Sequence, residues 1–293
     1  MSRTTNFYQL THLGGKDTVT GSCHLLQSKG LNILVDCGLA QGMDQVQSMS
    51  SWPIEPRDID FVFLTHAHID HIGRLPDLVY KGFCGEIICS HPTKALLVPL
   101  LEDALGFTDY SYRHKQKILE DIDQLCYGFE FNDEFFLKKG IRFKLGRAGH
   151  ILGSCFIRFE LSDNFSLVFS GDLGCKDTPI LCDPDISEPC DLLVLESTYG
   201  DRLHEDRSQR VKRLGKVLNQ ALADQGKVFI PAFALGRTQE LIYELNRLDI
   251  AQKQDFPVYL DSPLGLELTR IYHKLSPFWD QEAKILYKNG DHP

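Results

Sequence analysis

The feature that most constrains the fold of this chain is a group of three histidines and one aspartate within six residues. His66, His68, Asp70 and His71 directly follow the apolar segment Phe61-Val62-Phe63-Leu64. Such a segment is typical of a buried strand, and side chains two residues apart on an extended strand end point the same way. His66 and His68 are therefore expected to face one side. Asp70 and His71 follow where the chain turns into a helix.

These four side chains have the chemistry of a metal site. Nitrogen and oxygen donors of this kind suit zinc, and more than three of them in so short a segment indicate two ions side by side. A solvated, histidine-rich loop is the alternative. The regular spacing H-x-H-x-D-H after a buried strand favours the metal site, because it places several donors at one strand end.

Length and composition indicate an ordinary globular protein of two domains. The chain has 293 residues, of which 43% are hydrophobic and 24% charged, enough for two cores. The first seven residues lack an apolar signal segment, and no stretch approaches the length of a membrane span. Nine cysteines without CxxC spacing indicate reduced thiols. We therefore expect a cytoplasmic protein with no membrane segment.

The net charge limits how the chain can meet nucleic acid. It is −9, from 40 acidic and 31 basic residues, which argues against a protein that coats nucleic acid with a general basic surface. It leaves room for an enzyme that acts on nucleic acid. Two dications in a cleft are the largest local charges there and attract a polyanion.

Short β-branched and apolar segments run through the first two hundred residues and predict strands. Helical patterns at 93–105 and 114–126 interrupt them, so we expect sheets with helices outside. The predicted strands are 33–35, 61–64, 87–89, 155–159, 166–169 and 192–195.

After about Glu205 the pattern changes to alternating helix and strand, the order of a parallel βαβ sheet. We therefore expect one domain over residues 1–205 and a second, incomplete domain over residues 206–293. The predicted helices of the second domain are 211–222, 241–248 and 264–275, and its predicted strands are Val228-Phe229-Ile230 and Val258-Tyr259-Leu260.

Three further polar residues follow apolar strands and are candidates for the same site. Asp36 follows 33–35, Asp172 follows 166–169 with Ser170 and Gly171 between, and His150 lies in the glycine-containing segment 148–154. Each alone is weak evidence, since an aspartate or histidine beside glycine is usually a turn or loop residue.

Together with the H-x-H-x-D-H segment, these residues resemble the metallo-β-lactamase superfamily, in order, over nearly the whole first two hundred residues. The resemblance implies an α/β fold, an αβ/βα sandwich of two mixed sheets with a dinuclear zinc site at one edge. It also implies a role for each site residue: one zinc is held by His66, His68 and His150, the second by Asp70 and His71, Asp172 bridges both, and Asp36 supports the metal loop.

Four more segments are similar to the β-CASP branch, the RNA-processing nucleases that include the 3′-end cleavage endonuclease of pre-mRNA and its bacterial and archaeal relatives. In that branch a cap domain is inserted just beyond the acid at the Glu196 position, where the second domain begins here. The segments are 14–24 with Thr18-Val19-Thr20-Gly21-Ser22-Cys23-His24, Leu195 to Arg202, Pro231 to Glu240, and Tyr259 to Leu264.

Three residues of these segments are candidates for orienting a metal ligand or for binding the substrate phosphate. We place Glu196 behind the ligands, accepting the free ring N–H of a ligating histidine. Arg237, at a predicted helix start beside Gly236, is the candidate for phosphate binding, with Ser262 as a second. Taken singly, Glu196 also fits a strand cap and Arg237 an ordinary solvated residue.

The resemblance implies a zinc-dependent ribonuclease. In it a hydroxide shared by two zinc ions attacks an RNA phosphodiester, and Asp70 and Asp172 serve as ligands and orient the nucleophile. One alternative is a hydrolase of the same fold acting on a small ester, thioester or lactam, which has no need for a second sheet after Glu205. The other is a silent scaffold subunit of an RNA-processing complex, which typically loses metal ligands.

The carboxyl end departs from the family pattern. The pattern continues with two histidines in glycine-rich contexts, one for protonation and one completing the second zinc. His204, His273 and His292 lack that context. We therefore expect a piece of a longer enzyme, with weak activity of its own and with a homo-oligomer or an RNA-processing complex as its assembly.

Overall fold

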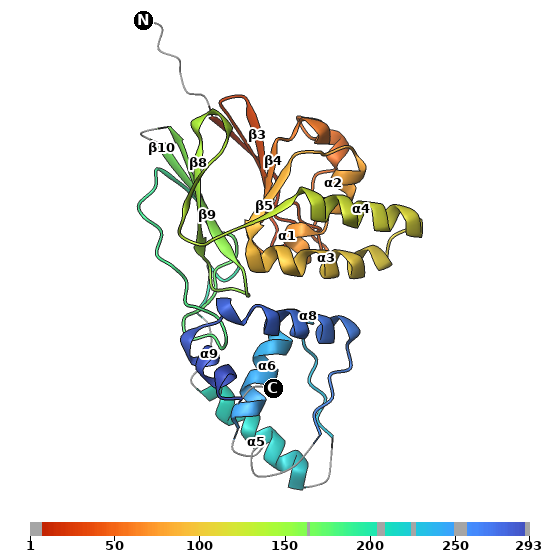
Figure 1. Ribbon diagram of the computed structural model, residues 1–293, viewed down its shortest axis with the longest axis vertical. Helices are drawn as coiled ribbons and strands as arrows, with labels where there is room; N and C mark the ends of the chain where they lie inside the picture. Colours follow the sequence, from red (N-terminus) through yellow and green to blue (C-terminus); the bar gives the residue numbers. More distant parts are fainter. Residues whose placement is uncertain (1–7, 163–164, 204–208, 224–226, 249–256, 291–293) are drawn as a thin grey trace, which may run out of the picture. The chain divides into compact units, whose positions relative to one another are not determined.

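The computed structural model describes residues 8–162, 165–203, 209–223, 227–248 and 257–290 (Figure 1). Contacts divide the chain into two units. The first comprises Met1–Lys176 and Asp183–Glu196, and the second comprises Asp177–Cys182 and Ser197–Pro293. The domain boundary expected after residue 205 stays a prediction.

The first unit contains a six-stranded sheet in which β1 to β6 follow one another in chain order. The first three strands pair antiparallel, and β3 to β6 pair parallel. Val35 of β3 lies opposite Phe63 of β4, so the residues after both strands emerge at one edge. The strands are β1 Tyr8–Gly14, β2 Cys23–Ser28, β3 Leu31–Val35, β4 Phe61–Phe63, β5 Glu86–Ser90 and β6 Cys126–Phe129.

A second sheet of five strands has the order β11-β10-β9-β8-β7. Only β10 and β11 pair parallel, with Phe169 opposite Val194, and this again brings the residues after two strands to one edge. The strands are β7 Glu134–Phe136, β8 Arg142–Arg147, β9 Cys155–Ser162, β10 Phe165–Phe169 and β11 Leu192–Val194.

A hydrophobic core joins the facing sides of the two sheets. Phe63 of the first sheet meets Phe143 and Phe159 of the second edge to face, with ring centroids 5.0 and 4.8 Å apart. All three rings are buried, and burying one such side chain contributes about 1.5–3 kcal/mol. This packing fixes the sheet edges that carry the site.

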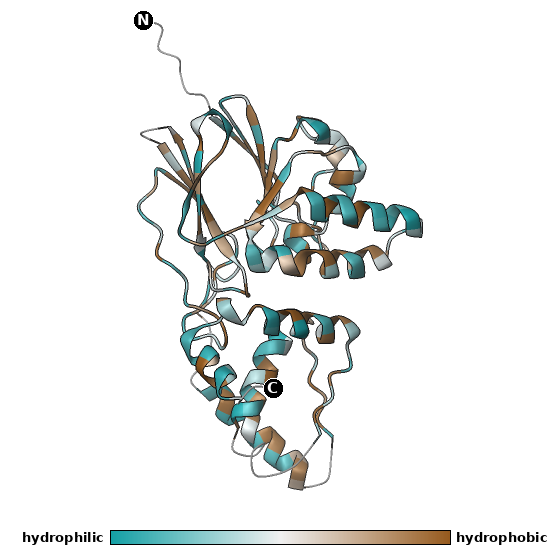
Figure 2. Ribbon diagram, in the orientation of Figure 1, coloured by the Kyte–Doolittle hydropathy of each residue, from teal (hydrophilic) through white to brown (hydrophobic). Residues whose placement is uncertain are grey.

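Helices cover the outer face of the first sheet (Figure 1). They are α1 Ile69–Ile72, α2 Leu75–Tyr80, α3 His91–Gly106 and α4 Tyr112–Leu125, and α4 is largely hydrophilic (Figure 2). The two helices predicted at 93–105 and 114–126 are confirmed as α3 and α4. Between the start of β7 and the end of β11, the described residues form no α-helix.

Among its described residues, the regular secondary structure of the second unit is helical. Leu218 of α5 packs against Leu245 of α6. No helix in the described parts of the chain is both long and apolar enough to cross a membrane. The helices are α5 Arg210–Ala223, α6 Arg237–Arg247, α8 Pro263–Lys274 and α9 Gln281–Lys288.

The two strands predicted for the second unit are wrong in the structure. Residues 227–230 and 257–260 do not form strands, and Phe229 and Tyr259 are 86% and 85% exposed. A strand depends on hydrogen-bonded neighbours and on burial of one face, and two strands alone are marginally stable in water. The described residues of this unit supply neither a third strand nor cover for these side chains.

Candidate metal centre

Loops at the carboxyl ends of strands supply most of the predicted ligands, and α1 supplies Asp70 and His71. His66 and His68 lie between β4 and α1, and His150 and Asp172 lie in the loops after β8 and β10. The Leu64 N–H donates to the Ile88 carbonyl at 2.9 Å, which extends the sheet pairing to the last residue before this loop. The loop therefore starts from a rigid edge.

Four donor atoms converge at this edge. His68 Nδ1 lies 3.0 Å from His66 Nε2 and 3.1 Å from His150 Nε2. Asp172 Oδ2 lies 3.7 Å from His66 Nε2 and 3.5 Å from His150 Nε2. All four atoms are within 4.8 Å of one another. The structure thus brings together residues that are up to 106 positions apart in the sequence.

This donor set fits a zinc-type ion. Donor atoms of a tetrahedral zinc site, each about 2.0–2.1 Å from the ion, lie about 3.3 Å apart, close to the 3.0 and 3.1 Å that separate His68 Nδ1 from the other two ring nitrogens. Burial lowers the pKa of His68 to about 3 and holds the pKa of His66 well below its usual value, with the neighbouring imidazoles adding to both effects. The rings are neutral at pH 7, the form that binds a metal.

A second group of donors shares Asp172. His71 Nε2 lies 3.3 Å from Asp172 Oδ1 and 3.9 Å from Asp70 Oδ2. Asp172 thus turns one oxygen toward the three-histidine group and the other toward His71. Burial raises the pKa of Asp172, but the hydrogen bond and charge of His71 outweigh it and hold that pKa below the usual value. The carboxylate is therefore ionised.

Asp36 orients His71 from behind. Its Oδ2 lies 2.7 Å from His71 Nδ1, and its Oδ1 accepts from the Thr65 N–H at 2.8 Å. Burial lowers the pKa of His71, but Asp36 and Asp172 together raise it well above the usual value. With Nδ1–H on Asp36, His71 presents Nε2 to the second donor group, a carboxylate–histidine arrangement typical of metal sites.

Ser22 is a supporting residue that sequence reasoning did not single out. Its N–H donates to the Asp70 carbonyl at 2.9 Å, and its hydroxyl donates to Asp36 Oδ2 at 3.0 Å. Gly38 completes this corner, because a Cβ there would lie 1.6 Å from the Asp70 carbonyl oxygen. The segment containing Ser22 was noted only for its family resemblance, and no spacing rule connects it to Asp70.

We predict that Ser22→Ala lowers the free energy of unfolding of the metal-free chain by about 1.5–2 kcal/mol, because it removes a hydrogen bond to the charged Asp36 carboxylate. Urea denaturation measures this, with Ser50→Ala, at an exposed serine, as the control. Equal stability of the two variants would show that the Ser22 hydroxyl does not support Asp36.

Hydrogen bonds hold Glu196 next to the loop that carries Asp172. Its Oε1 accepts from the Leu173 N–H at 3.0 Å, and its own N–H donates to Ser170 Oγ at 2.9 Å. These two bonds bracket the loop that carries Asp172. The expected bond to a ligating histidine ring stays a prediction, although the charge of Glu196 acts on His150: burial lowers the pKa of His150, and Asp172 and Glu196 oppose it.

Arg237 and Ser262 lie in the second unit, and each is at a helix start. Arg237 begins α6 after Gly236, as the sequence predicts, and its Nη1 donates to Glu240 Oε2 at 2.9 Å. Ser262 caps α8, with its Oγ accepting from the Gly265 N–H at 3.0 Å. Ser262 thus has a structural role, and phosphate binding by either residue stays a prediction.

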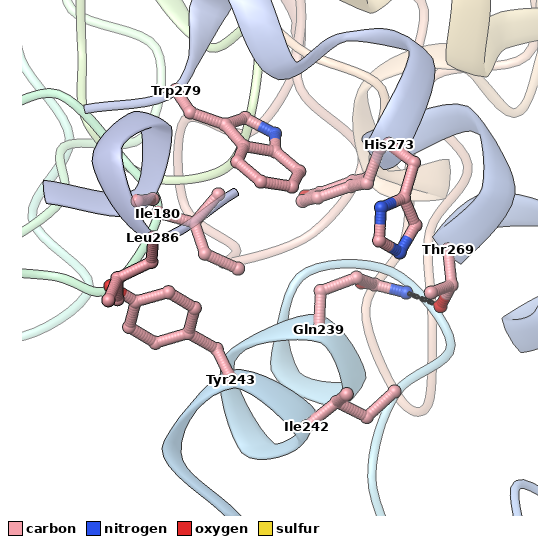
Figure 3. A pocket seen from close by; sticks show the side chains of 10 residues that line it. Ile180, Gln239, Ile242, Tyr243, Thr269, His273, Trp279 and Leu286 are labelled. Atoms are coloured by element: carbon pink, nitrogen blue, oxygen red, sulfur yellow. Dashed lines mark hydrogen bonds between the residues drawn. The ribbon is translucent and has the colours of Figure 1, made fainter. Parts of the chain in front are cut away.

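A pocket in the second unit is separate from these donors. It is lined by α6, α8 and α9 and holds about 30 Å³ (Figure 3), room for about two water molecules. The amide of Gln239 on its wall donates to Thr269 Oγ1 at 3.0 Å and to the Ala234 carbonyl at 3.0 Å. The Gln239 amide is therefore used within the fold.

The buried imidazoles also predict how stability depends on pH. Burial lowers the pKa of His24 to about 4 and that of His68 to about 3. Below about pH 6.5 these histidines are protonated in the unfolded chain but not in the folded chain. The free energy of unfolding of the metal-free chain should therefore fall as pH falls from about 6.5 to about 4, by up to about 1.4 kcal/mol per pH unit for each such histidine. His71, whose pKa is raised, acts in the opposite direction.

Urea denaturation of the metal-free chain across this range measures the slope. His24→Gln should reduce this slope by up to about 1.4 kcal/mol per pH unit, the contribution of one proton, because glutamine does not titrate. A stability that rises on acidification would show that the imidazoles are not held neutral.

Comparisons with known proteins agree with this geometry. The sequence model of the Metallo-beta-lactamase superfamily matches residues 17–231, and that of the Beta-Casp domain matches residues 238–292. "Ribonuclease TTHA0252" of Thermus thermophilus is 34% identical over 97% of this chain and 65% of its own length.

Two further relatives come from an archaeon and a plant. The "RNase J-like protein" of Methanocaldococcus jannaschii is 30% identical over 96% of this chain and 64% of its own. "Cleavage and polyadenylation specificity factor subunit 3-I" of Arabidopsis thaliana is 32% identical over 90% of this chain and 39% of its own. The chain thus spans at most 65% of the length of these three relatives. By fold, by the donor groups at the sheet edge and by both sequence matches, the chain belongs to the metallo-β-lactamase superfamily and to its β-CASP branch.

Proposed function

We propose that this chain holds two zinc ions and hydrolyses RNA phosphodiester bonds. The observation that carries the proposal is the position of Asp172, whose two oxygens face two separate donor groups. One carboxylate shared in this way is typical of sites with two metals about 3.5–4 Å apart. The names of the relatives, two of which contain ribonuclease or RNase, support RNA as the substrate.

Two zinc ions, when bound, acidify a water molecule and neutralise the charge that phosphate oxygens gain in the transition state. The chain's own residues prepare this chemistry. His66, His68 and His150 offer neutral ring nitrogens, and Asp36 holds His71 with Nε2 forward. Asp70 and Asp172 place carboxylate oxygens where they accept a proton from the attacking water and fix its direction.

Other residues would position the site and the RNA. Glu196 is proposed to hold the Asp172 loop through the Leu173 N–H. Arg237, 60% exposed at its side chain, is proposed to contact a phosphate, and Ser262, occupied as a cap, is the weaker candidate. A cytoplasmic location and assembly into a homo-oligomer or an RNA-processing complex remain part of the proposal.

The experiment is cleavage of an end-labelled, unstructured RNA under single-turnover conditions, which detects slow reactions. The zinc-loaded chain should cut the RNA, a chelator should stop cleavage, and added zinc should restore it. An intact RNA beside a chain with two bound zinc ions would contradict the proposal. Hydrolysis of a thioester under the same conditions would then favour a small-molecule hydrolase.

A further inference from the structure

The helix α5 carries a concentration of positive charge that stands out in an acidic chain. Between Arg210 and Ala223 it contains four basic residues and no Asp or Glu, although the net charge of the chain is −9. The acidic residues nearest in the sequence, Asp206 and Asp224, lie beyond its two ends.

The charges occupy one face of the helix. Leu214, Leu218 and Leu222 face the α6 side, where Leu218 is buried against Leu245. At about 100° per residue, Lys212, Arg213 and Lys216 fall on the opposite face, and all three are exposed. The hydrophobic contact thus fixes the helix with its basic side outward.

The two lysines of this face, Lys212 and Lys216, have no described ion pair within the part of the chain that the structure covers. Arg210 is held by Glu244, with Nη2 and Oε1 3.3 Å apart. No ion pair is described for Lys212 or Lys216 among the residues that the structure covers. Binding a phosphate therefore breaks no described ion pair at these two lysines, and both charges are available to an anionic partner.

We propose that the basic face of α5, formed by Lys212, Arg213 and Lys216, binds the phosphate backbone of RNA outside the metal centre. This rests on the proposed function, which makes RNA the substrate. A chain of net charge −9 repels a polyanion, so a local group of exposed cations gives the backbone a place to approach. Phosphate contacts of this kind add affinity without reading bases.

The test is the binding of a fluorescein-labelled oligouridylate to the zinc-loaded chain by fluorescence anisotropy at several salt concentrations. A gel confirms that the RNA is intact after each titration. The variant carries Lys212→Gln, Arg213→Gln and Lys216→Gln. Each phosphate contact to a single strand contributes about −0.7 to the slope of log K against log salt, so the slope should weaken by about 2 and the affinity at low salt should fall about 10- to 100-fold.

Two control proteins separate this face from net charge and from misfolding. Lys81→Gln, Arg113→Gln and Lys117→Gln remove the same three charges from exposed positions of the first unit and should leave the slope unchanged. Lys212→Arg with Lys216→Arg keeps the charge and should bind like the parent. Oligodeoxyuridylate should lose as much affinity as RNA.

The two proposals fail in different ways. If the chain binds RNA through α5 but never cuts it, the proposed function fails and the contact surface stands. The contact surface is overturned if both glutamine variants change the slope equally, if neither does, or if the parent does not bind RNA. An unaffected RNA affinity together with lost binding to an acidic protein would assign the face to a protein partner.

Discussion

Asp172→Ala should remove most bound zinc and slow RNA cleavage by about 10³-fold or more, since loss of a single preorganised group at the reacting centre commonly costs about 10²–10³-fold and this carboxylate serves both donor groups. Its Oδ2 faces His66 and His150, and its Oδ1 faces His71. Elemental analysis after dialysis and single-turnover cleavage measure the two effects.

Two comparison variants make the result specific. Glu196→Gln keeps a hydrogen-bond acceptor for the Leu173 N–H, so the loss of zinc affinity or of cleavage rate should be only about 10- to 100-fold. Asp133→Ala, at an exposed loop residue, should change neither quantity. If Asp172→Ala and Glu196→Gln lose zinc equally, Asp172 is not shared between two metals.

Asp36→Ala should lower the free energy of unfolding of the metal-free chain by about 3–5 kcal/mol, the range for breaking a buried charge pair by removing one partner. Asp36 is 1% exposed. The change leaves the Thr65 N–H and the protonated ring of His71 without their acceptor. Alanine is also strained at the φ of 59° found there.

Asp36→Asn separates charge from geometry. Asparagine tolerates the left-handed backbone and still accepts from Thr65, but it removes the negative charge beside His71 Nδ1 and leaves only the carboxylate of Asp172 on the Nε2 side. We expect an intermediate loss of stability in urea denaturation and, in zinc titrations, weaker binding of the second ion than of the first. Wild-type stability in Asp36→Ala would contradict the role given to this carboxylate.

The chemistry of the site could be predicted because donors in one short segment need little fold to bring them together. His66, His68, Asp70 and His71 follow one strand, and strand pairing alone places Asp36 beside them, since Val35 lies opposite Phe63. His150 and Asp172 were candidates from their own sequence contexts, and their roles as ligands came from the family resemblance. Their distances to the histidines depend on the packing of two sheets, which no local pattern contains.

Other features depended on contacts that a sequence does not display. Ser22 reaches Asp70 and Asp36 from the loop between β1 and β2, and serine is too common in loops to single out. The apolar segments 228–230 and 258–260 have the composition of strands, but such segments form strands only when other parts of the chain pair with them and bury one face. The described residues of the second unit provide neither pairing nor burial for them.

The number and position of bound zinc ions test the central claim most directly. Crystals of the zinc-loaded chain, with anomalous data at the zinc edge, should show two peaks about 3.5–4 Å apart. One should lie among His66, His68 and His150 and the other beside His71, with Asp172 between them. A single peak, or peaks away from Asp172, would contradict the shared-carboxylate site and the mechanism built on it.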